Sequence, residues 1–254
     1  MEKSLAARRL LEPDSMVEPW FDSVRDAAAR LPSLARGSWP SVAEIDRALA
    51  AAAGVRFVRG TKSRARRDPR RPIDGEQIYE IQIASRREVP TRADSAHDLL
   101  NALAWAALPA SKWALTAQLA AAQRARLADR PWRLPGARTR RHDRLALLDE
   151  GGILIALGSG AGPDRAMAGE VAAALARGQA RALVFGHALL EHALAGSLDV
   201  WGAALPFAVD AGGSTAELRA RLDAALAAAL ADGALLDEPA PWPRLGLTAL
   251  TGAA

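Results

Sequence analysis

Cysteine, aromatic residues and long apolar runs are absent or scarce in this sequence of 254 residues. Without cysteine, the chain cannot form disulfides, thiolate zinc sites or cysteine nucleophiles. No uncharged apolar stretch approaches the roughly 20 residues that are needed to span a bilayer. The N-terminus also lacks an apolar run of the length found in signal peptides. These absences predict a soluble cytoplasmic protein that has no membrane partner.

Alanine and leucine dominate the apolar half of the sequence, and both residues favour helices. No internal repeat or clear linker divides the chain. We therefore predict an α+β fold in which residues 1–254 form one predominantly helical domain with a few short strands and hairpins. Residues 1–40 carry several prolines and tryptophans. They are expected to wrap around a core at 41–254, with Trp20 and Phe21 as anchors.

Basic residues are concentrated in the first part of the chain. Residues 1–144 contain 27 Lys and Arg against 17 Asp and Glu, whereas residues 145–254 contain 6 against 12. Two arginine-rich segments with prolines, 59–72 and 129–142, are expected to be exposed connections. Such segments can bind nucleic-acid phosphates. The first has no aromatic residue to stack on bases, so we favour a solvated loop and keep a nucleic-acid-associated protein as an alternative.

Capping signals define the clearest helices. An S-x-x-E capping box precedes the helices predicted over 42–53 and 215–232, and Gly54 ends the first of them. The other expected helices are about 23–29; 94–108, capped by Asp94 or Ser95 and closed by Pro109; 111–128, capped by Ser111; 163–178, opened by Pro163; and a helix that ends at Gly196.

Short strands are predicted where apolar residues alternate or cluster. The segments are 55–58; 79–83 with 86–91 as its partner; 145–148 and 153–157; and 183–185, which could instead begin the helix that ends at Gly196. Residues 149–152 join two of these strands, and their two glycines suit a hairpin turn. Successive strand residues point to opposite faces, so only one of Asp149 and Glu150 is expected to enter a shared site.

The glycine-rich segment 158–162 (GSGAG) lies between a predicted strand and a predicted helix. This order can hold a phosphate at the N-terminus of a helix. However, the spacing is G-x-G-x-G rather than G-x-G-x-x-G, and Asp164 lies where a phosphate would bind. We therefore interpret the segment as a flexible loop. The sequence also contains no G-x-S-x-G and no H-E-x-x-H motif.

Side chains that can bind metals or transfer protons occur in three separated groups. They are His97, Asp98, Asn101 and Lys112; Asp143, Asp149 and Glu150; and His187, Glu191 and His192. Residues four apart on a helix share a face, which places His97 beside Asn101 and His187 beside Glu191. A His and a carboxylate at this spacing can hold a metal ion together with groups from a facing helix. His192 points elsewhere.

Five segments together carry a family pattern. They are Tyr79-Glu80; Val89 to Lys112 with HDLLNALAW; Asp143 to Gly152 with LDE; FGHALLE at 185–191; and WPRLG at 242–246. In this order they resemble the bacterial family known as domain of unknown function 3025. The resemblance covers about residues 20–246, and the Ala- and Gly-rich segment 158–181 departs from it. The resemblance implies no reaction, cofactor or catalytic residue, but it groups the same polar side chains.

We predict that the three polar groups meet in one site. The catalytic candidates are His97, Asp98, Asn101, Lys112, Asp149 and Glu150, and the candidate metal ligands are His97, His187 and Glu191. Such nitrogen and oxygen donors suit a divalent metal, and Lys112 could steady an anionic substrate or intermediate. The first hypothesis is an enzyme that acts on a small molecule by metal-assisted hydrolysis, or by acid–base chemistry without a metal. The alternative is a non-catalytic protein whose polar cluster is structural.

Overall fold

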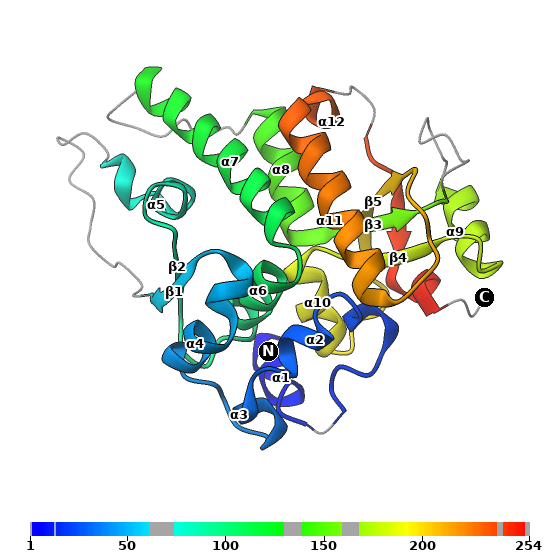
Figure 1. Ribbon diagram of the computed structural model, residues 1–254, viewed down its shortest axis with the longest axis horizontal. Helices are drawn as coiled ribbons and strands as arrows, with labels where there is room; N and C mark the ends of the chain where they lie inside the picture. Colours follow the sequence, from blue (N-terminus) through cyan, green and yellow to red (C-terminus); the bar gives the residue numbers. More distant parts are fainter. Residues whose placement is uncertain are drawn as a thin grey trace.

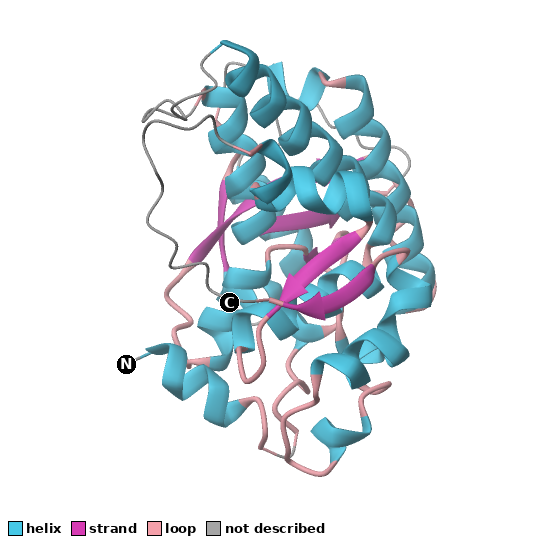
Figure 2. Ribbon diagram, turned by 90° about the vertical axis from the view of Figure 1, so that its left-hand side faces the viewer, coloured by secondary structure: helices cyan, strands magenta, loops and turns pink. Residues whose placement is uncertain are grey.

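A small sheet lies among helices that pack on both of its faces (Figures 1 and 2). This computed structural model describes residues 2–12, 14–60, 74–129, 139–158, 168–237 and 241–251. The strand order is β4-β3-β5-β6. The strands are β3 (Gly152–Ala156), β4 (Arg181–Val184), β5 (Trp201–Phe207) and β6 (Arg244–Gly246). Strand β3 pairs parallel with β5, whereas its pairing with β4 and that of β5 with β6 are antiparallel.

The α+β prediction is confirmed, and helices predominate among the described residues. The helices are α1 (Glu2–Arg9), α2 (Arg25–Ala28), α3 (Pro32–Ala35), α4 (Val42–Ala53), α5 (Tyr79–Arg86), α6 (Ala96–Ala107), α7 (Pro109–Asp129), α8 (Arg140–Gly151), α9 (Ala168–Ala176), α10 (His187–Leu194), α11 (Thr215–Asp232) and α12 (Ala234–Asp237). A second, two-stranded parallel sheet consists of β1 (Arg56–Arg59) and β2 (Glu88–Thr91). Within the described chain, no helix combines the length and apolar character needed to cross a membrane.

Strand β3 separates two apolar clusters because its side chains alternate between the faces of the sheet. Ile153 and Ile155 belong to a cluster with residues of α1, α2, α4, α6 and α10. Leu154 and Ala156 belong to a second cluster with residues of α7, α8 and α11. All five residues of β3 are buried, which is typical of a strand covered by helices on both faces.

Three capping predictions are confirmed. Ser41 accepts a hydrogen bond from the backbone N–H of Glu44 at the start of α4, and Ser95 does the same for Asp98 in α6. Ser214 and Glu217 form the full capping box of α11. Helix α7 differs from the prediction because it begins at Pro109 rather than after Ser111. Its first backbone N–H groups, at Ala110 and Ser111, donate to the carboxylate of Asp223 on α11, so the cap comes from another helix.

Two predicted strands are helices. Residues 79–83 lie in α5, and β2 pairs with β1 instead of with them. Five alternating residues are too few to separate a strand from a helix that buries Ile81 and Ile83. Residues 145–148 lie in α8, which buries Leu145 and Leu148, three residues apart, while Leu147 is exposed.

The remaining predictions are confirmed in part. Strand β1 agrees with the strand predicted at 55–58, and residues 183–184 are in β4, so the strand alternative holds there. Helix α2 is shorter than the predicted segment, and α10 ends at Leu194, before Gly196. Helix α9 lies in the described part of the segment predicted at 163–178. Residues 159–167, which include most of GSGAG and Pro163, lie outside the described residues, as do 61–73 and 130–138 in the two arginine-rich segments.

Candidate functional site

The ends of two helices, α8 and α10, meet beside the sheet. Helix α8 ends at Gly151, β3 begins at the next residue, and α10 begins at His187 directly after Gly186. The backbones come close here: a Cβ atom added at Gly186 would lie 2.5 Å from the carbonyl oxygen of Glu150 and would also clash with Gly151. The N–H groups of Phe185 and Gly186 both donate to the carbonyl of Gly152. This contact brings the end of α8 against the start of α10.

The imidazoles of His97 and His187 face each other at this junction. Their Nε2 atoms are 3.1 Å apart, and the ring centroids are 4.4 Å apart at an interplanar angle of 66°. Oε2 of Glu150 lies 3.6 Å from Nε2 of His187. One ligand atom from each of His97, His187 and Glu150 lies within 4.8 Å of the other two. These three side chains therefore surround one point.

Glu191 lies on the other edge of the His97 ring. Its Oε2 is 2.9 Å from Nδ1 of His97, and this hydrogen bond raises the pKa of His97 despite its partial burial. A carboxylate can only accept, so Nδ1 of His97 carries the proton. In neutral His97, Nε2 is left with a lone pair that points toward His187 and Glu150. Glu191 thus orients the His97 ring from the edge opposite to His187.

His187 is 3% exposed. Burial lowers its pKa to about 4, although the negative charge of Asp149 opposes this shift. The ring is therefore neutral at pH 7, and one of its nitrogens carries a lone pair. Its Nδ1 is buried without a hydrogen-bond partner, whereas its Nε2 lies 3.1 Å from Nε2 of His97.

Both carboxylates at the end of α8 line the same cavity. The expectation that only one of Asp149 and Glu150 enters the site was wrong, because neighbours in a helical turn diverge by about 100° rather than pointing to opposite faces. Burial, followed by the charge of Asp149, raises the pKa of Glu150. Burial alone would also raise the pKa of Asp149, but the Lys112 charge keeps that pKa below its usual value.

Lys112 is a buried cation that links two of the predicted groups. Its Nζ donates to Oδ1 of Asp149 at 2.5 Å and to Oδ1 of Asn101 at 2.8 Å. It also lies 5.7 Å from the ring centroids of Trp105 and Phe185. The apolar rings and the two acceptors hold the ammonium group in one position.

Tyr79 and Arg92 are site residues that sequence reasoning missed. Nδ2 of Asn101 donates to Oη of Tyr79 at 3.1 Å. The guanidinium of Arg92 pairs with both carboxylate oxygens of Asp98 at 2.8 and 2.5 Å, and its backbone N–H donates to the same carboxylate. Asp98 is therefore held by Arg92. Tyr79 is the single tyrosine of the chain, but the strand predicted at 79–83 separated it from the helical groups.

A cavity of about 350 Å³ opens onto these groups. It is lined by Gly60, Tyr79, Glu80, Pro90, Arg92, His97, Asp98, Asn101, Asp149, Glu150 and His187. Four of the predicted residues do not line it. Lys112 and Glu191 are bonded to residues that do, whereas Asp143 is exposed in the first turn of α8 and His192 is exposed on α10. The site is thus made by one end of each of α5, α6, α8 and α10.

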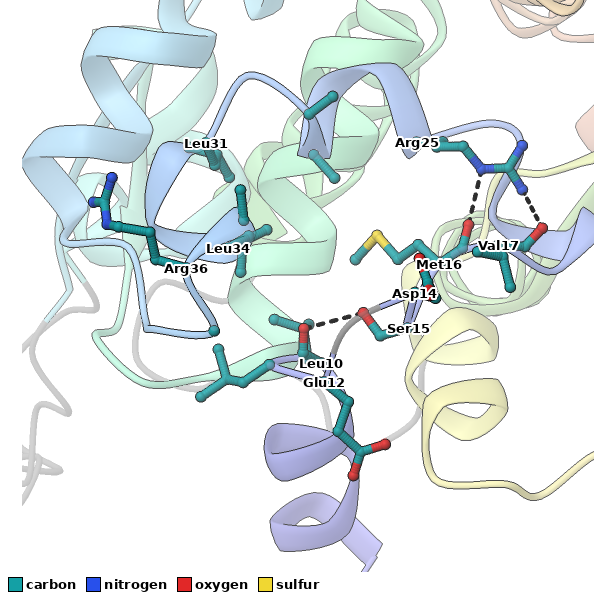
Figure 3. A pocket seen from close by; sticks show the side chains of 15 residues that line it. Leu10, Glu12, Asp14, Ser15, Met16, Val17, Arg25, Leu31, Leu34 and Arg36 are labelled. Carbon is teal, nitrogen blue, oxygen red and sulfur yellow. Dashed lines mark hydrogen bonds between the residues drawn. The ribbon is translucent and has the colours of Figure 1, made fainter.

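A larger cavity of about 690 Å³ lies near the N-terminus (Figure 3). Its walls are mostly apolar, with Leu10, Leu31 and Leu34 among the lining residues. Arg25 donates to the carbonyl groups of Met16 and Val17. No imidazole lines this cavity, so the smaller cavity is the candidate for chemistry.

Comparison with known proteins gives a family assignment. No curated protein and no solved structure matches the chain. A family model described as "Protein of unknown function (DUF3025)" matches residues 68–253. This range includes α5, α6, α8 and α10 and therefore every residue of the site except Gly60. Because the match covers well over half of the sequence, the chain belongs to the DUF3025 family.

Proposed function

We propose that this protein is a metal-dependent hydrolase in which His97, His187 and Glu150 bind one divalent ion. The observation that carries the proposal is the 3.1 Å separation of the two Nε2 atoms. An ion with metal–nitrogen bonds of about 2.0–2.1 Å and tetrahedral angles separates its ligand nitrogens by about 3.3 Å. The two imidazoles therefore already lie at the spacing that one ion requires.

The composition of the ligand set also supports the proposal. Two imidazoles and one carboxylate leave a coordination position open, as in catalytic zinc sites, and that position would face the cavity. Glu191 has the place of the outer carboxylate that orients a metal-binding histidine through its other nitrogen. The low pKa of His187 favours the neutral ring, which is the form that binds metals.

A bound ion would supply a water molecule with a pKa near 7 and would polarise a carbonyl oxygen. The chain supplies the remaining groups. Asp149 is a carboxylate anion that lines the cavity, so it can accept a hydrogen bond from a water molecule there. Lys112 holds this carboxylate in place at 2.5 Å. Hydrolysis is the reaction class that needs only these groups and water.

Elemental analysis of the purified native protein tests the metal site. The wild-type chain should contain about one equivalent of a transition metal, directly or after reconstitution with zinc. His187→Ala should lose it. His192→Ala is the matched control, because His192 is an exposed imidazole on the same helix, and this variant should keep the metal. An absence of metal from the reconstituted wild-type protein would contradict the proposal and favour metal-free acid–base chemistry.

Glu191→Gln gives a second, graded test. Loss of an outer carboxylate weakens metal affinity by about 10–100-fold, without removing a ligand. We therefore expect Glu191→Gln to bind zinc more weakly in a competition titration with a chelator. If His97→Ala and His187→Ala lower the melting temperature but metal affinity is absent in all proteins, the cluster is a structural network instead. A chelator-sensitive hydrolysis of ester or amide substrates would establish the reaction class.

A further inference from the structure

We propose that Tyr79 donates a hydrogen bond to the substrate and that the substrate presents the uncharged carbonyl oxygen of an ester or amide. This inference rests on the proposed metal site, which it extends by naming an additional catalytic residue and a substrate class. The evidence is a chain of hydrogen bonds that runs from Lys112 through Asn101 to Tyr79.

Lys112 sets the direction of this chain. An ammonium group has three donors and no acceptor. The Asn101 atom that faces Nζ at 2.8 Å must therefore be the amide oxygen, Oδ1. This assignment places the amide nitrogen, Nδ2, on the opposite side, where it faces Oη of Tyr79 at 3.1 Å. Asn101 is buried, so its amide has no solvated alternative to this orientation.

The direction of the Asn101 bond determines the role of Tyr79. Because Nδ2 can only donate, Oη of Tyr79 accepts, and the phenol proton must point elsewhere. No acceptor within the described part of the chain takes that proton, and Tyr79 lines the cavity together with His97 and Glu150. The free donor is therefore available to a molecule in the cavity. Burial of the hydroxyl, and then the charge of Asp149, raises the pKa of Tyr79, so the phenol stays protonated.

The cations of the site argue for an uncharged substrate group. Arg92 is already paired with Asp98 through two side-chain hydrogen bonds, and Lys112 is paired with Asp149 and Asn101. Among the described residues around the cavity, these are the two cationic side chains. The charge of each is therefore already balanced by a carboxylate, which weakens the attraction of these side chains for a phosphate or carboxylate. A neutral ester or amide needs no such partner.

The proposed reaction uses the phenol as a donor without consuming its proton. A water oxygen bonds to the carbonyl carbon, and the π electrons move to the carbonyl oxygen, which becomes an oxyanion. Tyr79 donates to this oxygen. When the oxyanion reforms the carbonyl, the bond to the alcohol or amine breaks, and the leaving group takes a proton that the water gave up. The products are a carboxylic acid and an alcohol or amine. Lys112 and Asn101 are positioning residues in this scheme.

Acetohydroxamic acid is a suitable probe because it offers a carbonyl oxygen and binds metal ions. The test uses zinc-reconstituted, full-length protein and measures zinc content and probe affinity separately. Tyr79→Phe should keep the zinc of the wild type but bind the probe about tenfold more weakly, the effect of one lost hydrogen bond. In the wild type, Tyr79 is the single tyrosine, so a ¹³C label on its ζ carbon gives one resonance, which should shift when the probe binds.

Asn101→Asp tests the hydrogen-bond direction. This variant has almost the same shape, but its carboxylate accepts from both neighbours, so the Tyr79 hydroxyl would donate to it and be lost to the substrate. We expect the variant to retain zinc and to resemble Tyr79→Phe in its weaker probe binding. If either variant retains zinc and binds the probe with wild-type affinity, the proposed role of Tyr79 is overturned, but the proposed metal site is not. If inorganic phosphate displaces the probe at a lower concentration than acetamide does, the proposed substrate class is overturned.

The proposed function fails in a different way. A wild-type protein that takes up no zinc would overturn the metal site and, with it, this inference. Normal zinc uptake with an unshifted Tyr79 resonance would leave the metal site standing and overturn the role of Tyr79. Melting curves of both variants would establish whether they are folded; Tyr79 is 41% exposed, so Tyr79→Phe is not expected to destabilise the chain strongly.

Discussion

Replacing Lys112 by methionine should destabilise the protein more than the loss of any exposed ion pair. Lys112 is 2% exposed, and its Nζ lies 2.5 Å from Oδ1 of Asp149. Methionine fills much of the same volume between Trp105 and Phe185 but leaves the Asp149 carboxylate without its cation. The variant therefore measures the cost of an unpaired buried charge rather than that of a cavity.

The Lys112–Asp149 distance and the burial of the pair determine how much stability the variant should lose. At an effective dielectric constant of about 20, two unit charges 2.5 Å apart attract each other by about 7 kcal/mol before desolvation is counted. Removing one partner of a buried pair costs about 3–5 kcal/mol in measured cases. The Asp149 side chain is 24% exposed and keeps some hydration, so we expect the lower end, about 3 kcal/mol. For a chain of this length, that corresponds to a fall of about 6–12 °C in melting temperature.

Thermal or urea unfolding of four proteins provides the assay. They are the wild type, Lys112→Met, Asp149→Asn and the double variant. Because the double variant has no unpaired charge, it should melt above Lys112→Met. If Lys112→Met melts within about 2 °C of the wild type, or if the two losses simply add in the double variant, the pair does not contribute in the way that its burial predicts.

Two further predictions concern the parts that support the site. Gly186→Ala should lower the melting temperature by about 4–8 °C, because the added methyl group meets the backbone of Gly151; Gly169→Ala, where nothing lies within 4 Å, should be neutral or stabilising. The Ser33 hydroxyl and N–H hold the pKa of Glu44 below its usual value, so its contribution is present above its unfolded pKa and is lost as the pH falls through the folded one. Glu44→Gln should melt about 2–4 °C below the wild type at pH 7, and this gap should shrink as the pH falls below the unfolded pKa of a glutamate; a constant gap would contradict the assignment.

Local signals in the sequence predicted those elements whose ends are fixed by their own residues. Ser41 and Gly54 bound α4 as predicted, and Ser214 begins α11. In each case, the cap and the helix are neighbours in sequence, so the pattern contains the whole interaction. The start of α7 was misplaced because its cap, Asp223, comes from a distant helix.

The hairpin predicted around 149–152 shows why elements that depend on distant contacts could not be predicted from the sequence. The pair Gly151-Gly152 was correctly interpreted as a break, but a break between two strands and a break between a helix and a strand require the same residues. Leu145 and Leu148 lie on one helical face, but four residues are too few to establish the helical period. The tertiary contact of Gly186 with this turn decides the geometry, and it joins segments about 35 residues apart.

The spacing of His187 and Glu191 could indicate that both face His97, but it could not assign their roles. One helical turn rises about 5.4 Å, so side chains four residues apart are separated by roughly that distance along the helix. This is about the width of an imidazole ring plus the length of one hydrogen bond, so the two side chains can contact opposite edges of the same ring. His187 meets the Nε2 edge of His97, whereas Glu191 meets the Nδ1 edge. An ion held at Nε2 lies beyond the reach of a carboxylate that binds Nδ1. In the proposed metal site, the third ligand therefore comes from another element. Glu150 at the end of α8 has a carboxylate oxygen within 4.8 Å of a ring nitrogen of both imidazoles.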